Sequence, residues 1–301
     1  MYEHFFGLAG KPFSLLPDAD FLYMSRRHRM ALNLLDYGMT TQAGFVVITG
    51  EVGAGKTTVV RRFLRATHDD LTIGVVTNAS TGFGTLMSLI SMAFGLEHRG
   101  LDNIALYNQF VEFLVMQYSL GKRTLLVVDE AQNLSIEMLE DLRMLSNVNN
   151  EKDQLLQVVL VGQPELLAVL KRPELRQFAQ RITVHYHLEA LGAKETTAYI
   201  HHRLSVVGGR PELFDNLACI TAHYFTGGIP RLLNLLCDLS LVYAFAEEAR
   251  SVTFETVVDV VADRSTTGLS PFRSLPDGFE RNQFKEEIAR LPPVQESYSA
   301  S

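Results

Sequence analysis

One stretch of the sequence has the residue types and spacing of a phosphate-binding loop. Gly50, Gly55, Lys56 and Thr57 follow the pattern G-x-x-x-x-G-K-T, directly after the apolar run 45–48. That run predicts a short buried strand, and the residues from Lys56 onward predict a helix. The glycines allow backbone N–H groups to converge on an anion, and the helix N-terminus adds its dipole. We expect Lys56 to reach the β- and γ-phosphates and the Thr57 hydroxyl to hold Mg²⁺. The residues expected to contact the nucleotide in this loop are Gly50, Glu51, Val52, Gly53, Ala54, Gly55, Lys56, Thr57 and Thr58.

A second chemical signal is the acidic pair Asp129-Glu130, which ends the apolar run 124–128. Such a run is typical of a strand that is buried on both faces in a parallel sheet. The carboxyl ends of parallel strands share one edge of the sheet, so the pair should lie beside the phosphate loop. We expect Asp129 to bind Mg²⁺ and Glu130 to orient or deprotonate the attacking water. ATP and Mg²⁺ are therefore the predicted cofactors.

The elements that must position these residues form an alternating pattern in the first part of the chain. Further strands are predicted at 71–78, 155–163 and 182–188, with amphipathic helices between them. This alternation indicates an α/β fold with a doubly wound parallel sheet. From Gly192 onward the pattern is only helical, and it predicts a second domain. The four helices expected there are 195–206, 213–225, 230–248 and 254–263.

Four regions follow from this pattern. Residues 1–24 are rich in aromatic residues and proline, and we expect them to pack near the nucleotide. Residues 25–191 are the predicted α/β nucleotide-binding domain, and residues 192–264 the helical lid domain. Residues 265–301 are predicted to form a flexible tail with one short helix at 283–291.

Composition limits the classes of function. The chain has 301 residues, of which 47% are hydrophobic, and a net charge of −7. The acidic balance argues against binding to duplex DNA. Cys219 and Cys237 lie in apolar helical patterns and suit buried thiols in a reducing compartment. The N-terminus lacks the layout of a signal peptide, and the apolar window 232–246 is too short to cross a bilayer. We therefore expect a cytoplasmic protein without direct membrane insertion.

Several motifs resemble the ExeA/GspA family of AAA+ ATPases (general secretion pathway protein A), and the resemblance covers about residues 1–264. Within the family, the segments 140–146 and 225–231 are most similar to secretion ATPases of exosortase/PEP-CTERM exopolysaccharide loci. The segments that carry the family resemblance are 6–8, 11–14, 17–18, 50–58, 129–134, 160–166, 176–182 and 227–231. The resemblance implies a P-loop AAA+ parallel sheet with a C-terminal four-helix lid.

The resemblance also implies roles for five further residues. Gln163 matches sensor 1, which contacts the γ-phosphate or the water, and Arg231 matches sensor 2, which reports the nucleotide to the lid. Asn78 is placed like the residue that restrains the catalytic glutamate. Arg181 lies where these proteins carry the arginine finger that is donated to the neighbouring protomer, and Arg176 is the alternative.

The implied function is hydrolysis of ATP to ADP and phosphate, coupled to assembly or remodelling of an envelope export system for protein, pilus or exopolysaccharide. The implied partners are other copies of the chain, in a ring such as a hexamer or in a filament, and export proteins that bring it to the inner membrane. Two alternatives stand beside this interpretation. One is an ATP-dependent, DNA-binding transposition helper, and the other is a slow nucleotide-dependent assembly switch.

Overall fold

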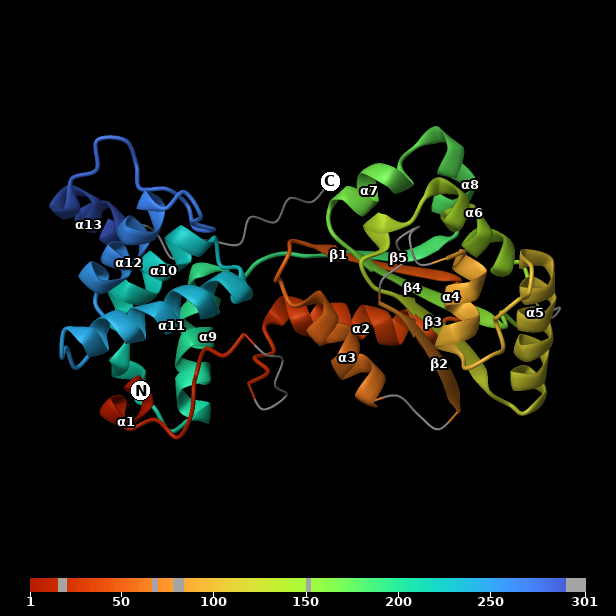
Figure 1. The fold of residues 1–301 in the computed structure, drawn as a ribbon, viewed down its shortest axis with the longest axis horizontal. Coiled ribbons are helices and arrows are strands. Elements are labelled where there is room, and N and C mark those ends of the chain that lie inside the picture. The colour runs from red at the N-terminus through yellow and green to blue at the C-terminus, as the bar shows by residue number, and fades with distance from the viewer. Residues whose placement is uncertain (16–20, 67–69, 78–83, 150–152, 291–301) are drawn as a thin grey trace. The chain divides into compact units, whose positions relative to one another are not determined.

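The computed structural model describes residues 1–15, 21–66, 70–77, 84–149 and 153–290. The chain divides into two compact units (Figure 1). One comprises Arg26–Glu189, and the other combines Met1–Ser25 with Ala190–Ser301. The chain therefore passes between the units twice. We call them the sheet unit and the helical unit.

The sheet unit is built on a five-stranded sheet in the order β2-β3-β4-β1-β5, and every pairing in it is parallel. The inner strands β1 and β4 are buried along their whole length, whereas the edge strand β5 is half exposed, as its alternating sequence predicts. The predicted α/β parallel fold is thus confirmed. The strands are β1 (Phe45–Gly50), β2 (Leu71–Val76), β3 (Arg123–Val128), β4 (Leu156–Gly162) and β5 (Ile182–Leu188).

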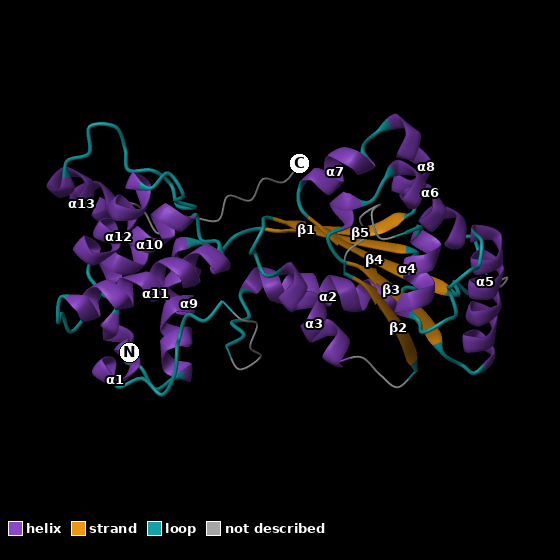
Figure 2. Cartoon of the chain, in the orientation of Figure 1, coloured by secondary structure: helices purple, strands orange, loops and turns teal. Residues whose placement is uncertain are grey.

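Helices cover both faces of this sheet (Figure 2). Successive side chains of a strand point to opposite faces, so Val46 and Ile48 pack with α2 and α3, while Phe45 and Val47 pack on the other side. The helices of the first face are α2 (Arg26–Thr40) and α3 (Lys56–Ala66). Those of the second face are α4 (Leu86–Ala93), α5 (Asn103–Ser119), α6 (Ile136–Leu145), α7 (Glu165–Leu170) and α8 (Arg176–Ala179), with the short 3₁₀ helices η2 (Ala131–Asn133) and η3 (Pro173–Leu175).

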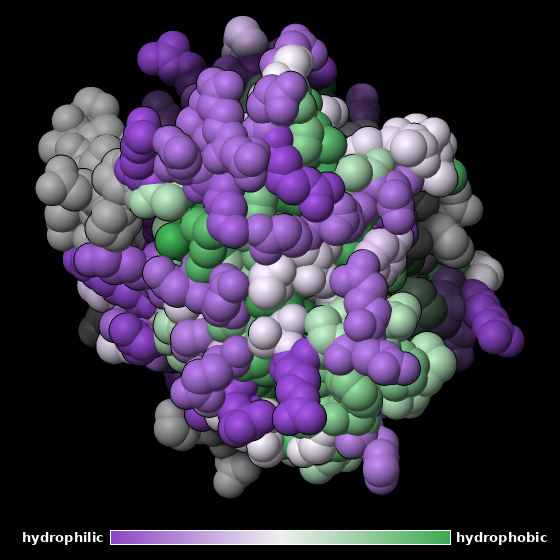
Figure 3. All heavy atoms as spheres, turned by 90° about the vertical axis from the view of Figure 1, so that its left-hand side faces the viewer, coloured by the Kyte–Doolittle hydropathy of each residue, from purple (hydrophilic) through white to green (hydrophobic). Residues whose placement is uncertain are grey.

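The helical unit contains the four successive helices that the sequence predicts. They bury a separate apolar core, to which Leu204, Phe225, Leu236 and Val257 contribute. The surface of this unit that faces the viewer in Figure 3 is largely hydrophilic, with scattered apolar residues. Its helices are α1 (Tyr2–Phe6), α9 (Ala193–Val206), η4 (Pro211–Leu213), α10 (Asn216–Thr226), α11 (Pro230–Ala246), α12 (Phe254–Thr266) and α13 (Arg281–Arg290). None of the helices in the described part of the chain combines the length and the hydropathy that a bilayer-spanning segment needs.

The N-terminal segment packs within the helical unit. Tyr2, Leu8 and Phe13 are buried in its core. The buried Arg203 of α9 holds the segment from inside, because its Nε donates to the carbonyl of Pro12 at 2.6 Å. Contact of this segment with a nucleotide stays a prediction.

The segment after α12 contributes buried side chains to the helical unit and contains a helix where the sequence predicts one in the tail 265–301. Phe284 and Ile288 lie four residues apart on one side of α13 and are buried in the core of the helical unit. Lys285 of α13 also pairs with Glu255 of α12 at 2.5 Å. Helix α13 spans Arg281–Arg290, close to the predicted 283–291.

Candidate functional site

The phosphate loop joins β1 to α3, and its glycines are required by close contacts. Gly53 and Gly55 have positive φ angles of 82° and 102°. A Cβ atom at Gly55 would lie 2.6 Å from Nε2 of His28 on α2, and one at Gly50 would lie 2.5 Å from the carbonyl oxygen of Leu188 on β5. The structure therefore has no room for side chains at Gly50 and Gly55.

Lys56 is bound by the loop that precedes it. Its Nζ donates to the carbonyl oxygens of Gly50 at 2.7 Å and Glu51 at 2.9 Å, and the residue is only 6% exposed. Burial lowers the pKa of this ammonium, while the negative charges of Glu130 and Asp129 act in the opposite direction.

The two residues predicted to hold Mg²⁺ are in direct contact, although 72 positions separate them in the chain. Oγ1 of Thr57 donates to Oδ2 of Asp129 at 3.0 Å, and Oδ1 of Asp129 accepts the backbone N–H of Glu130 at 3.0 Å. The backbone N–H of Asp129 donates to the carbonyl of Val76, which ties the end of β3 to the end of β2. Within the described residues, no cluster of three or more His, Cys, Asp and Glu side chains forms a metal site. A hydroxyl and one carboxylate suit Mg²⁺, which usually keeps several waters and binds substrate phosphates as well.

Glu130 has a left-handed backbone, with φ at 54°, which is uncommon for a residue other than glycine. Its Oε2 accepts two side-chain amides, from Gln132 at 2.6 Å and from Gln163 at 3.2 Å. The pKa of Glu130 is lowered, first by the hydrogen bond from Gln132 and then by Gln163 and the charge of Lys56, against the opposing effect of burial. Glu130 is therefore ionised near neutral pH and lies next to Gln163, the residue predicted to act as sensor 1.

Sequence reasoning missed Gln132. Its Nε2 binds Glu130, and its Oε1 accepts the backbone N–H of Gln163 at 3.0 Å. The only sequence signal is its place two residues after the acidic pair, within a motif that the family resemblance already includes.

The other predicted site residues are not hydrogen-bonded to this group around Glu130 in the part of the chain that the structure describes. Arg181 precedes β5, and its guanidinium donates to Oγ of Ser146 at 2.7 Å and to Oδ1 of Asn147, both just after α6. Arg176 is exposed at the start of α8. Asn78 lies outside the described residues.

Arg231 belongs to the helical unit, where it is exposed in the first turn of α11. The turn before it depends on Gly228, which has a φ of 74° and whose added Cβ would lie 2.0 Å from the carbonyl oxygen of Leu191. The backbone N–H of Leu191 in turn donates to the carbonyl of Gly228 at 3.0 Å. Only glycine fits this turn, which fixes the point where the helix of Arg231 begins.

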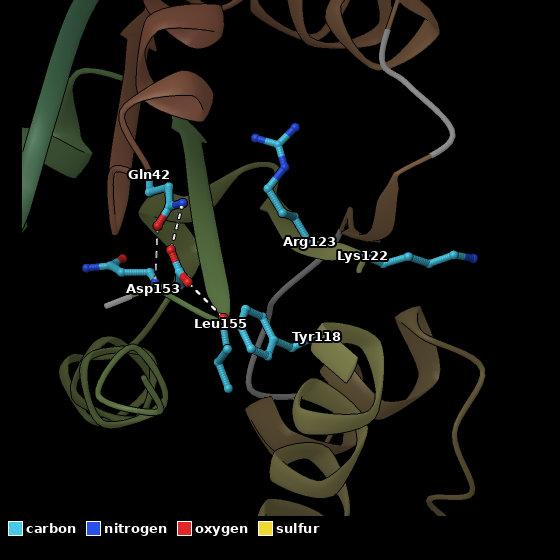
Figure 4. Close-up of a pocket in the computed structure, with 7 residues that line it drawn as sticks. Gln42, Tyr118, Lys122, Arg123, Asp153 and Leu155 are labelled. Atoms are coloured by element: carbon cyan, nitrogen blue, oxygen red, sulfur yellow. Dashed lines mark hydrogen bonds between the residues drawn. The ribbon is translucent and has the colours of Figure 1, made fainter. Parts of the chain in front are cut away.

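A small hollow of about 190 Å³ lies at the opposite end of the strands (Figure 4). Asp153 in this hollow accepts hydrogen bonds from Gln42 at 3.2 Å and from Tyr118 at 2.8 Å. Arg123, which also lines it, begins β3, whereas Asp129 follows the other end of that strand. The hollow is therefore distinct from the phosphate-loop site.

Comparison with known proteins identifies the family. Residues 39–170 match the model of the AAA domain family. General secretion pathway protein A of Aeromonas hydrophila is 44% identical over 255 residues, which are 84% of this chain and 46% of that protein. The chain carries an AAA domain of the ExeA/GspA type. The predicted resemblance to general secretion pathway protein A is thus confirmed, although the chain spans less than half the length of this relative.

Solved structures agree on the fold of this AAA protein. The ORC2 protein of Aeropyrum pernix, solved as ADPNP-ADP complexes, has a TM-score of 0.62 at 17% identity, with 86% of this chain and 74% of that chain covered. Cdc6p of Pyrobaculum aerophilum has a TM-score of 0.62 at 18% identity, with 85% and 75% covered. At these identities the likeness establishes the P-loop AAA+ fold alone.

Proposed function

We propose that this chain hydrolyses ATP to ADP and phosphate. The observation that carries the proposal is the contact between the phosphate loop and the acidic strand end, where Thr57 binds Asp129 at 3.0 Å. This contact brings the predicted metal ligands together beside Glu130. The AAA domain match supports a nucleoside triphosphate as the substrate.

Each residue of the site has a role in this reaction. The loop N–H groups and Lys56 would bind the phosphates, and Lys56 would exchange its two loop carbonyls for phosphate oxygens. Thr57 and Asp129 would hold Mg²⁺, which when bound supplies neutralisation of the phosphate charge. Glu130 would orient the attacking water and accept its proton, and Gln163 would contact the water or the γ-phosphate.

We propose that a neighbouring protomer completes the site through an arginine. Arg181 is the first candidate, because it lies just before the edge strand with its guanidinium directed at the end of α6. Arg176, exposed five residues earlier, is the second. The isolated protomer would then be a slow ATPase, and assembly of the homo-oligomer would accelerate it. We also propose that Arg231 acts as sensor 2 and reports the bound nucleotide to the lid. Asn78 would restrain the Glu130 carboxylate.

For the biological process we propose assembly or remodelling of an envelope export system. The relative named general secretion pathway protein A supports this, and the narrower motif resemblance extends it to exopolysaccharide export. The chain would reach the inner membrane through a partner. Copurification with export proteins encoded beside it would test this setting, and copurification with a transposase instead would contradict it.

The test of the enzymatic proposal is Mg²⁺-dependent phosphate release from ATP by the wild type and by Lys56→Met. The variant should lose at least about 100-fold in turnover, because it removes a charge that contacts the transferring phosphoryl group. Lys171→Met is the matched control, since Lys171 is exposed at the end of α7 and outside the site. A wild type that releases no phosphate above the level of Lys56→Met would contradict the proposal.

A further inference from the structure

We propose that Gln132 is a positioning residue that holds the Glu130 carboxylate for activation of the attacking water; this inference rests on the proposed ATP hydrolysis. Neither the loop pattern nor the family match gives this residue a role. Two hydrogen bonds carry the inference, to Glu130 and to Gln163, and the absence of a side chain at Gly162 leaves room for them.

The two hydrogen bonds use both ends of the Gln132 amide. Its Oε1 accepts the backbone N–H of Gln163 at 3.0 Å. A backbone N–H only donates, so the oxygen of the amide must face β4 and the NH₂ must face Glu130. The NH₂ group then donates to Oε2 of Glu130 at 2.6 Å. One rigid planar group therefore joins the carboxylate after β3 to the backbone after β4.

The absence of a side chain at Gly162 explains why the amide fits between the strand ends. A Cβ atom at Gly162, the last residue of β4, would lie 3.0 Å from Oε1 of Gln132. The backbone of Gln132 is itself fixed, because η2 is closed by hydrogen bonds to the carbonyls of Glu130 and Ala131, and Ala131 is fully buried. The side chain is thus held from both sides.

This arrangement decides which carboxylate oxygen is available for chemistry. Gln132 and Gln163 both donate to Oε2 of Glu130. Among the hydrogen bonds of the described residues, none is made to Oε1 of Glu130. The two amides occupy Oε2, and we assign Oε1 as the oxygen that accepts the proton from water.

Two variants of the full chain test the role by steady-state ATP hydrolysis, with kcat and KM for ATP measured separately. Gln132→Met keeps the shape and removes both hydrogen bonds, whereas Gln132→Glu keeps the acceptor for Gln163 and places a negative charge beside Glu130. We expect kcat to fall by up to about 100-fold in both, as for a displaced catalytic group, with KM for ATP nearly unchanged. Gln177→Met, at an exposed position of α8, is the control.

The split between kcat and KM separates positioning from a general structural role. A displaced general base lowers kcat while the phosphate loop still binds ATP, so KM should stay near its wild-type value. A structural defect at the strand ends would instead weaken nucleotide binding and turnover together.

The possible outcomes are distinct. Wild-type kcat in both variants would overturn the role of Gln132 and leave ATP hydrolysis intact. Loss of nucleotide binding together with turnover would also overturn it, since the residue would then be structural. A wild type without turnover would overturn the proposed function, and this inference with it.

Discussion

Replacement of Glu130 by glutamine should separate nucleotide binding from hydrolysis. The glutamine side chain has nearly the same shape, and its carbonyl oxygen can accept the amides of Gln132 and Gln163 that now converge on Oε2. The contact between Thr57 and Asp129 does not involve the Glu130 side chain and should persist. The variant therefore removes the proton acceptor while leaving the rest of the site in place.

The expected magnitude follows from the role of a general base, which contributes about 10²–10⁴ in rate. This corresponds to about 3–5 kcal/mol of transition-state stabilisation. Affinity for ATP should be retained, because loss of one carboxylate beside the loop reduces repulsion of the phosphates. Phosphate release at saturating Mg·ATP measures the first effect, and titration with a fluorescent ATP analogue measures the second.

Glu174→Gln is the matched control, because it removes one exposed carboxylate of the same unit at η3, away from the loop. It should leave both quantities unchanged. Glu130→Gln with near wild-type kcat would refute the assignment of Glu130 as the base. Loss of ATP binding in this variant would show instead that Glu130 supports the shape of the loop.

Two further predictions concern the helical unit and the assembly of the site. Gly228→Ala should lower the free energy of unfolding by at least about 2 kcal/mol, because it combines a positive φ with a backbone clash. Gly268→Ala is the control, because Gly268 has a similar φ but no atom near an added Cβ. Urea denaturation should show a smaller loss of unfolding free energy for this variant. Equal losses in the two variants would contradict the backbone clash at Gly228. Arg181→Ala should reduce turnover by about 10³-fold or more at protein concentrations that allow assembly, as expected for a finger in trans. A larger effect of Arg176→Ala would transfer that role to Arg176, and full turnover in both variants would refute a finger from this region.

The sequence predicts the local elements well, because burial leaves a clear pattern in them. The buried run 45–48 and the alternating run 182–188 each became a strand, at the centre and at the edge of the sheet respectively. The strand order was not predictable in the same way. Periodicity reports which faces of a strand are buried, but not which strands are neighbours, so the position of β4 between β3 and β1 comes only from the structure.

The part of the site that lies at the carboxyl ends of the strands could be predicted from the sequence. The contact of Thr57 with Asp129 follows from two loops that share the carboxyl ends of parallel strands. The amide network around Glu130 was not predictable. It depends on the left-handed backbone of Glu130 and on the room beside Gly162, and neither leaves a pattern in the sequence.

The packing of the segment before Arg290 was not predictable for a related reason. Its prolines, glycines and charges are typical of a linker, but Phe284 packs against Phe225 and Phe254, with ring centroids 5.8 and 6.0 Å apart. Such long-range contacts join residues far apart in the chain, so local composition does not reveal them. Burial of a few aromatic side chains is enough to fix a short helix in place.

The measurement that tests the account most directly is ATP turnover per protomer across a range of protein concentrations, with and without duplex DNA. We predict a slow rate at low concentration that rises steeply as protomers assemble and does not respond to DNA. Absence of Mg²⁺-dependent turnover at every concentration would contradict the central claim that this site hydrolyses ATP. A flat, very low rate that rises only with DNA would favour a DNA-bound helper over an export ATPase.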